Sequence, residues 1–165
     1  CGMVCKSLFL DGTLDCNAEY LNIFRKTEDA LDAQTGLYQI SDFSRFLLRT
    51  VDAGALAARR RRNYVRLKDA LVQLGVPPIC RLAEDACPLV LPIRVKDRDA
   101  LRRRLMEHRI YCAVHWPFDG VQADERPLAR ELAAHMLSLP IDQRYDTAHI
   151  DYLMDTIDTC KGLLL

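Results

Sequence analysis

The stretch PLVLPIRV, residues 88–95, decides the fold class, because it is a short run of apolar side chains between turn residues. It predicts a β-strand in which Pro92 marks an edge position or a bulge, since proline cannot donate to a strand ladder. Two further runs, IYCAVH at 110–115 and MLSLPI at 136–141, predict a second and a third strand. The three short strands favour a small, mostly antiparallel sheet.

Helices are predicted between and after these strands. Asp97 is expected to cap a helix before the second strand, and a short helix is expected at about 128–135. Asp146 or Thr147 is expected to cap the last helix of the chain. The apolar face of that last helix is formed by Ile150, Leu153, Met154 and Ile157.

The segment before the first of these strands is predicted to be mainly helical. Residues 3–10, MVCKSLFL, are expected to form a strand, and a helix is expected at 18–31 behind the N-cap Asn17. A long helix is then expected at 41–74, with Gly54 as the candidate kink. The whole pattern predicts an α+β fold, in which a long helix precedes a small antiparallel sheet with helices on one face.

The composition excludes several classes of protein. The 165 residues include 23 basic and 23 acidic side chains, and this balance argues against a dedicated nucleic-acid-binding protein. The apolar runs are too short to span a bilayer, so no membrane partner is expected. Seven cysteines without a CxxC pair, and four histidines without metal-site spacing, favour a reduced, cytoplasmic chain with no metal. Because the sequence begins with Cys1, we expect it to be a piece of a longer protein.

Four consecutive arginines, 59–62, lie within the predicted long helix. Successive helical residues point about 100° apart, so these side chains do not form one basic patch. Two interpretations stay open. The arginines form ion pairs on a solvated helix, or one or two of them face a domain or subunit interface.

Three stretches carry a family resemblance through their order and spacing. They are ISDFS (40–44) with RRRRNY (59–64) and Leu67, then PIRV (92–95) with Arg98, Asp99, RIY (109–111) and VHWP (114–117), and finally MLSLPIDQRY (136–145). Together they resemble the C-terminal half of the DegT/DnrJ/EryC1/StrS sugar aminotransferases. The resemblance covers nearly the whole chain from about residue 17, and LSLPIDQRY is its most specific part.

The resemblance implies the small domain of a fold-type-I pyridoxal phosphate enzyme. Residues 41–165 would be this C-terminal α+β domain, and residues 1–40 the strand and helix left from the junction with a missing large domain. Family members form homodimers and use pyridoxal phosphate to transfer an amino group to a keto-sugar bound to a nucleotide. The cofactor belongs mostly to the large domain. We therefore expect this chain to bind no cofactor and to be inactive alone.

The sequence departs from the family just before the predicted long helix. Many members place Gly-x-Asn-x-Arg there, whereas this chain reads GLYQI at 36–40. Two alternatives therefore remain: a catalytically inactive relative kept for binding or assembly, or a stand-alone module that binds a small metabolite. Lys6, in KSLFLDG at 6–12, faintly resembles the segment around the Schiff-base lysine and is the one catalytic candidate. A surface lysine on a strand is the simpler interpretation.

His115 and Trp116 are the candidate substrate-binding residues, because the matching family segment faces the sugar between the two domains. Alternation along a strand would put Tyr111, Ala113 and His115 on one face and Cys112, Val114 and Trp116 on the core side. Loops that follow strand ends often carry binding sites, which favours a role for His115. The alternative is that Trp116 belongs to the core and His115 to its rim.

Overall fold

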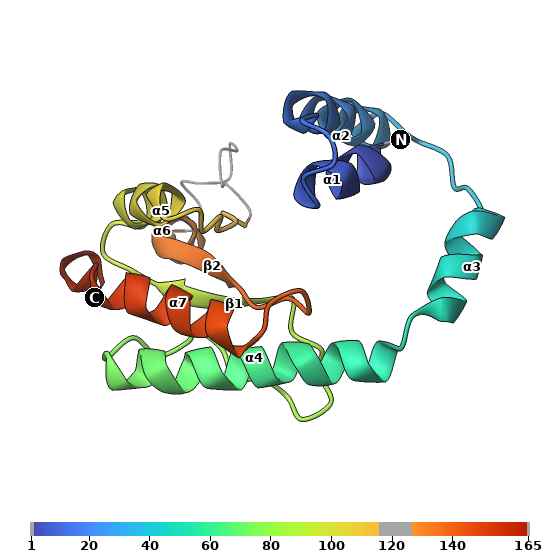
Figure 1. Ribbon diagram of the computed structural model, residues 1–165. Helices are drawn as coiled ribbons and strands as arrows, with labels where there is room; N and C mark the ends of the chain where they lie inside the picture. Colours follow the sequence, from blue (N-terminus) through green and yellow to red (C-terminus); the bar gives the residue numbers. More distant parts are fainter. Residues whose placement is uncertain (1, 116–126, 165) are drawn as a thin grey trace. The chain divides into compact units, whose positions relative to one another are not determined.

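The computed structural model describes residues 2–115 and 127–164 of the chain (Figure 1). Their contacts divide the chain into two compact units, Cys1–Thr50 and Val51–Leu165. The elements of the first unit are α1 (Gly2–Leu10), α2 (Asn17–Asp32) and α3 (Asp42–Thr50). Those of the second unit are α4 (Ala53–Gln73), β1 (Val90–Arg94), α5 (Arg98–Glu107), α6 (Pro127–His135), β2 (Met136–Pro140), α7 (Thr147–Asp158) and the 3₁₀ turn η1 (Lys161–Leu163).

The sheet of the second unit is an antiparallel pair formed by β1 and β2. Leu91 lies opposite Leu139 and Ile93 opposite Leu137, and all four side chains are fully buried. Because side chains alternate along a strand, these four lie on the same face of the sheet. The predicted α+β fold with a small antiparallel sheet is confirmed.

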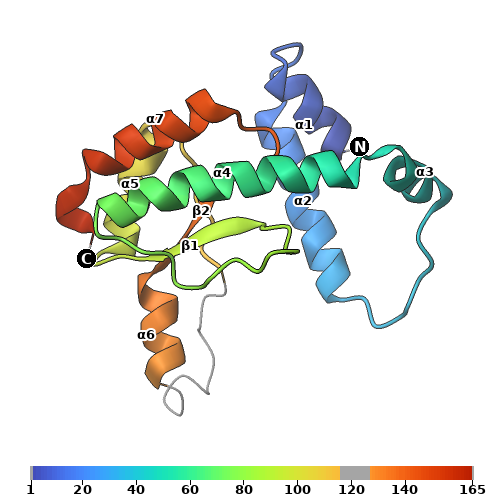
Figure 2. The same cartoon turned by 90° about the horizontal axis from the view of Figure 1, so that it is seen from below.

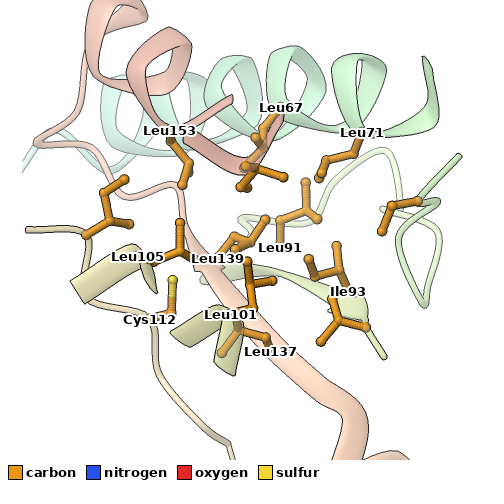
Figure 3. Packing of buried hydrophobic residues seen from close by; sticks show 14 of the residues in the cluster. Leu67, Leu71, Leu91, Ile93, Leu101, Leu105, Cys112, Leu137, Leu139 and Leu153 are labelled. Carbon is orange, nitrogen blue, oxygen red and sulfur yellow. The ribbon is translucent and has the colours of Figure 1, made fainter. Parts of the chain in front are cut away.

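Helices α4, α5 and α7 pack with the sheet in one hydrophobic core, to which loop residues such as Cys112 also contribute (Figure 3). Helix α4 packs on β1 and lies beside α7, and α5 packs on β2 (Figure 2). The buried leucines and isoleucines of these three helices are Leu67, Leu71, Leu101, Leu105, Ile150, Leu153 and Ile157. This core holds strand β2 and residues 110–115, which pass beside it, in position.

Two predicted N-caps are confirmed, and the predicted N-cap Asn17 is wrong, because Cys16 holds that position and Asn17 is the first residue of α2. The carboxylate of Asp97 accepts the Ala100 N–H at 2.9 Å at the start of α5. Asp146 caps α7: its carboxylate accepts the backbone N–H of His149 at 3.1 Å and lies 2.6 Å from His149 Nδ1. These bonds satisfy N–H groups that have no partner inside the helix.

The predicted strand at 3–10 is wrong, because these residues form helix α1. Helix α1 packs against α2, where the rings of Phe9 and Tyr20 have centroids 5.7 Å apart. Gly2 is buried at Ile23, where an added Cβ would come within 2.9 Å of the isoleucine side chain. An apolar run without clear periodicity is compatible with both structures, and here packing against a second helix selects the helix.

The single long helix predicted at 41–74 is also wrong, because it is divided into α3 and α4. Asp52 causes the break: its side chain accepts the Ala55 N–H at 2.8 Å and caps a new helix at Ala53. Gly54 therefore lies in the first turn of α4, not at a kink. The division of the chain into two compact units falls between Thr50 and Val51.

Residues 110–115 do not form the predicted strand. They make one isolated bridge, in which Ser138 N donates to the carbonyl oxygen of Ala113 at 3.2 Å. The neighbouring carbonyl of Cys112 accepts a hydrogen bond from Arg102 Nε at 3.3 Å, so the ladder does not extend. Within the described residues the sheet therefore has two strands.

No helix in the described ranges is both long and apolar enough to cross a membrane.

Candidate functional site

The candidate site is formed by residues 110–115 where they pass beside strand β2. His115 Nδ1 is 2.8 Å from the hydroxyl oxygen of Ser138, and Ser138 is almost completely buried. Either Ser138 donates to Nδ1, or the protonated Nδ1 donates to Ser138. In both cases a buried group on a rigid strand orients the half-buried imidazole.

The predicted alternation between exposed and core-facing side chains is seen along residues 111–114. Tyr111 is exposed and Cys112 is buried, and Val114 packs against the core. Burial raises the pKa of the Cys112 thiol to about 12, so this cysteine is a core residue without thiolate character. Trp116, the second substrate-binding candidate, lies outside the described residues.

Asn63 joins two of the stretches that carry the family resemblance. Its side-chain nitrogen lies 3.2 Å from the carbonyl oxygen of Ile141 and 3.0 Å from those of Asp142 and Tyr145. Asn63 is buried on α4, and the three carbonyls belong to the loop between β2 and α7. The amide therefore fixes the path of this loop. The signal in the sequence was a polar residue on the apolar stripe of the helix, one turn before Leu67.

Two of the four arginines bind loops of the same unit. Arg60 donates to the Gln143 side chain at 2.8 Å and to the Pro88 carbonyl at 3.3 Å. Arg61 donates to the carbonyl oxygens of Ala83 and Ala86. These two side chains keep bonds at the solvated surface, but they bind backbone and amide groups within the unit and not the acidic side chains expected of an ion-paired helix.

Asp142 and Arg144 form a two-pronged ion pair in the loop that Asn63 holds, with nitrogen–oxygen distances of 2.9 and 2.6 Å. Burial alone would raise the pKa of Asp142. The hydrogen bonds from the side chain and backbone of Arg144 outweigh it and hold that pKa below its usual value. The loop is therefore tied together within itself as well as to α4.

Lys6 lies on helix α1 and not on a strand. Its ammonium nitrogen is 5.6 Å from the centre of the Phe24 ring, a cation–π contact within the first unit. In the second unit, Lys68 and Lys161 pair with the neighbouring acids Asp69 and Asp158. A Schiff-base lysine needs a phosphate cradle and an acid beside the pyridine nitrogen, and none of these three surroundings fits that arrangement.

A search of residues 2–115 and 127–164 finds no group of three or more metal-ligating side chains.

Comparison with solved structures finds the same fold in sugar aminotransferases. Spr1654 from Streptococcus pneumoniae, assigned as a sugar aminotransferase and solved in its PMP form, superimposes with a TM-score of 0.60 at 18% identity. The sugar aminotransferase CalS13 from Micromonospora echinospora gives 0.58 at 19% identity. A DegT DnrJ EryC1 StrS aminotransferase from Brucella abortus gives 0.56 at 21% identity. The chain shares the fold of one part of these aminotransferases.

The extent of the likeness defines that part. The matches to Spr1654 and CalS13 each cover 66% of this chain but only 31% of the solved structure. The match to the Brucella abortus protein covers 65% of this chain and 31% of that structure. The chain therefore spans about a third of the length of these structures. No protein-family profile matches the sequence. No curated protein matches it either. The predicted resemblance to sugar aminotransferases of this type is confirmed at the level of the fold.

Proposed function

We propose that this chain is the small-domain portion of a pyridoxal-phosphate-dependent nucleotide-sugar aminotransferase-like protein. One observation carries the proposal: the fold of two thirds of the chain recurs in sugar aminotransferases that are about three times as long as the matched part. Spr1654 has been solved in both PLP and PMP forms, which supports pyridoxal phosphate as the cofactor of the parent protein. The parent's partners would be a large domain, a second identical subunit and a sugar substrate.

The chain alone is proposed to be inactive in transamination. The cofactor supplies the electron sink of the reaction, and the protein must supply a lysine, a phosphate cradle and a substrate pocket. The described surroundings of Lys6, Lys68 and Lys161 are those of surface lysines. Six described cysteines are free thiols, which supports a reducing, cytoplasmic location for the parent.

His115 is proposed to contact the substrate from the small-domain side. The bond to buried Ser138 fixes the ring, and a ring held in this way can donate to or accept from a sugar hydroxyl or a phosphate oxygen. Trp116, the next residue, is proposed to stack on the sugar ring. Both roles require the large domain to complete the cleft.

The test uses the full-length protein that contains this chain. His115→Ala should raise the Michaelis constant for the sugar substrate about tenfold, the effect of losing one hydrogen bond to a charged or polar ligand group. Cofactor content should stay unchanged, and the melting temperature should fall by less than a core truncation would cause, because the Ser138 hydroxyl loses one hydrogen bond. The matched control is His135→Ala, since the ring of His135 bonds the Val95 carbonyl at 3.1 Å and has no proposed contact with substrate. A stability loss without a change in the Michaelis constant would refute the role of His115.

A catalytically inactive relative that serves assembly is the second candidate. The GLYQI segment at 36–40 lacks the asparagine and arginine that many members place there, and its apolar side chains are exposed. Leu37 and Tyr38 lie in the open, as do Phe43 and Phe46 on the adjacent helix α3. Exposed apolar side chains of this size are typical of a surface that is covered by another protein part. A full-length protein that dimerises but does not bind pyridoxal phosphate would support this candidate over the first.

A further inference from the structure

A pocket of about 290 Å³ lies in the second unit, between the end of α5, the end of β2 and the first half of α7. Buried Ile150 and Leu153 form part of its apolar wall. Tyr111, Tyr145 and Tyr152 also line it. His115 is not among the lining residues, so this pocket is separate from the candidate site described above. Its size is at the small end of the range for pockets that bind small molecules.

Arg109 lines this pocket with an unusual backbone conformation. Its φ is +58°, the one positive value at a non-glycine residue in the described ranges. It follows α5 in a Schellman turn, in which Arg109 N donates to the Met106 carbonyl and Ile110 N to the Leu105 carbonyl, both at 2.9 Å. Glycine suits this position best because it has no Cβ, and arginine is disfavoured there. An arginine in a strained position is a reason to look for a role of its side chain.

The charge of the pocket identifies what the guanidinium can bind. No aspartate or glutamate lines the pocket. Within the described part of the chain, Arg109 forms no ion pair. It is therefore an exposed positive charge at the rim of an apolar, tyrosine-lined space. A guanidinium of this kind binds a carboxylate through two parallel hydrogen bonds.

The N-terminus of α7 argues against a phosphate in this pocket. Asp146 already occupies that helix end, with its carboxylate 3.1 Å from the His149 nitrogen and 2.6 Å from His149 Nδ1. A phosphate would need free N–H groups there and would be repelled by the Asp146 carboxylate. An anion in this pocket therefore has Arg109, and not the N-terminus of α7, as its partner.

Aromatic side chains indicate the rest of the ligand. Tyr152 is fixed by a hydrogen bond of its hydroxyl to the His108 carbonyl at 3.3 Å. Tyr145 is half-buried, and its ring centre lies 5.9 Å from that of His149. Rings held in this way offer faces and edges to a planar ring. We propose that this pocket binds a small aromatic carboxylate, with the acid group on Arg109 and the ring among the tyrosines.

The experiment titrates the 165-residue chain with 4-hydroxybenzoate and follows binding by calorimetry and amide chemical shifts. The neutral analogue 4-hydroxybenzamide and inorganic phosphate serve as comparison probes. Arg109→Gly is the decisive variant, because glycine fits the positive φ and keeps the helix end folded. Arg103→Ala removes an exposed arginine of α5, the helix that precedes Arg109, outside the pocket and is the matched control.

We expect 4-hydroxybenzoate to bind at least about tenfold more tightly than the amide or phosphate. Arg109→Gly should weaken its binding about tenfold or more, at an unchanged or higher melting temperature, and Arg103→Ala should bind as the wild type does. Equal binding of the acid and the amide would overturn the proposal. Undiminished binding by Arg109→Gly, or the absence of any binding at millimolar concentrations, would overturn it as well. None of these outcomes depends on the aminotransferase activity of the parent protein.

Discussion

Asn63 allows a strict test of how the second unit is held together. Its amide is nearly the same shape as a carboxylate, so Asn63→Asp changes the hydrogen-bonding character of the group without leaving a cavity. The wild-type nitrogen donates to the carbonyl oxygens of Ile141, Asp142 and Tyr145 at 3.0–3.2 Å. In the variant, acceptor atoms would face these three acceptors.

The magnitude follows from this geometry. An amide nitrogen has two N–H groups, and the loss of each hydrogen bond contributes about 1 kcal/mol. Leaving buried carbonyls without a donor adds roughly 1–3 kcal/mol. Because two of the three bonds are only partly buried, water replaces part of that loss. We expect Asn63→Asp to lower the free energy of unfolding by about 3 kcal/mol at neutral pH, roughly 10 °C in melting temperature.

The assay is urea unfolding followed by circular dichroism at pH 7 and pH 4. A protonated aspartic acid can donate one hydrogen bond, so the deficit of Asn63→Asp relative to wild type should shrink at the lower pH. Gln73→Glu, the same exchange at an exposed residue of α4, is the control and should cost about 0.5 kcal/mol or less. If Asn63→Asp unfolds within about 0.5 kcal/mol of wild type, Asn63 does not hold the loop.

Three further predictions concern the core, a helix cap and the exposed face of α3. Leu139→Ala should lower the free energy of unfolding by about 2–5 kcal/mol in urea titrations, whereas Leu128→Ala at an exposed site should change it by less than about 0.5 kcal/mol. Hydrogen bonds from the backbone and ring of His149 lower the pKa of Asp146, so its stabilising effect is present above pH ~4 and is lost as the pH falls further. Asp146→Ala should therefore lower the melting temperature at pH 7, with a difference from wild type that shrinks as the Asp146 carboxylate is protonated in acid. Phe43 and Phe46 should make the chain associate and bind a hydrophobic dye, and replacing both by serine should reduce both effects in light scattering and fluorescence.

Local chemistry explains why part of this fold could be predicted from the sequence. Asp97 and Asp146 cap their helices as expected, because a cap depends on a few neighbouring residues. The strands at β1 and β2 were found because short apolar runs lie between turn residues. The end of α4 was found at Gly75, whose φ of +79° suits glycine.

Two of the failures depended on partners distant in the sequence, and the third on a local cap that the apolar pattern concealed. Residues 3–10 form a helix because α2 is available to pack against. The segment 110–115 is not a strand because the Arg102 side chain, and not another strand, binds the Cys112 carbonyl. Asp52 was missed as a cap because the apolar pattern continues past it.

The candidate site was predictable only in part. The sequence singled out His115, but its contact with buried Ser138 required the structure. The role of Asn63 was missed although the resemblance included it, because a lone asparagine in a helix does not reveal its acceptors. The pocket at Arg109 was not foreseen either, since it depends on a positive φ that glycine normally signals.

The central claim is that this chain is a small domain that relies on other parts of its parent for cofactor binding. The most direct test incubates the 165-residue chain with pyridoxal phosphate, reduces it with borohydride and maps the pyridoxyl adducts by mass spectrometry. We predict weak labelling spread over exposed lysines, with no site labelled stoichiometrically. A stoichiometric adduct on Lys6 that disappears in Lys6→Ala would contradict the claim and identify Lys6 as the Schiff-base residue.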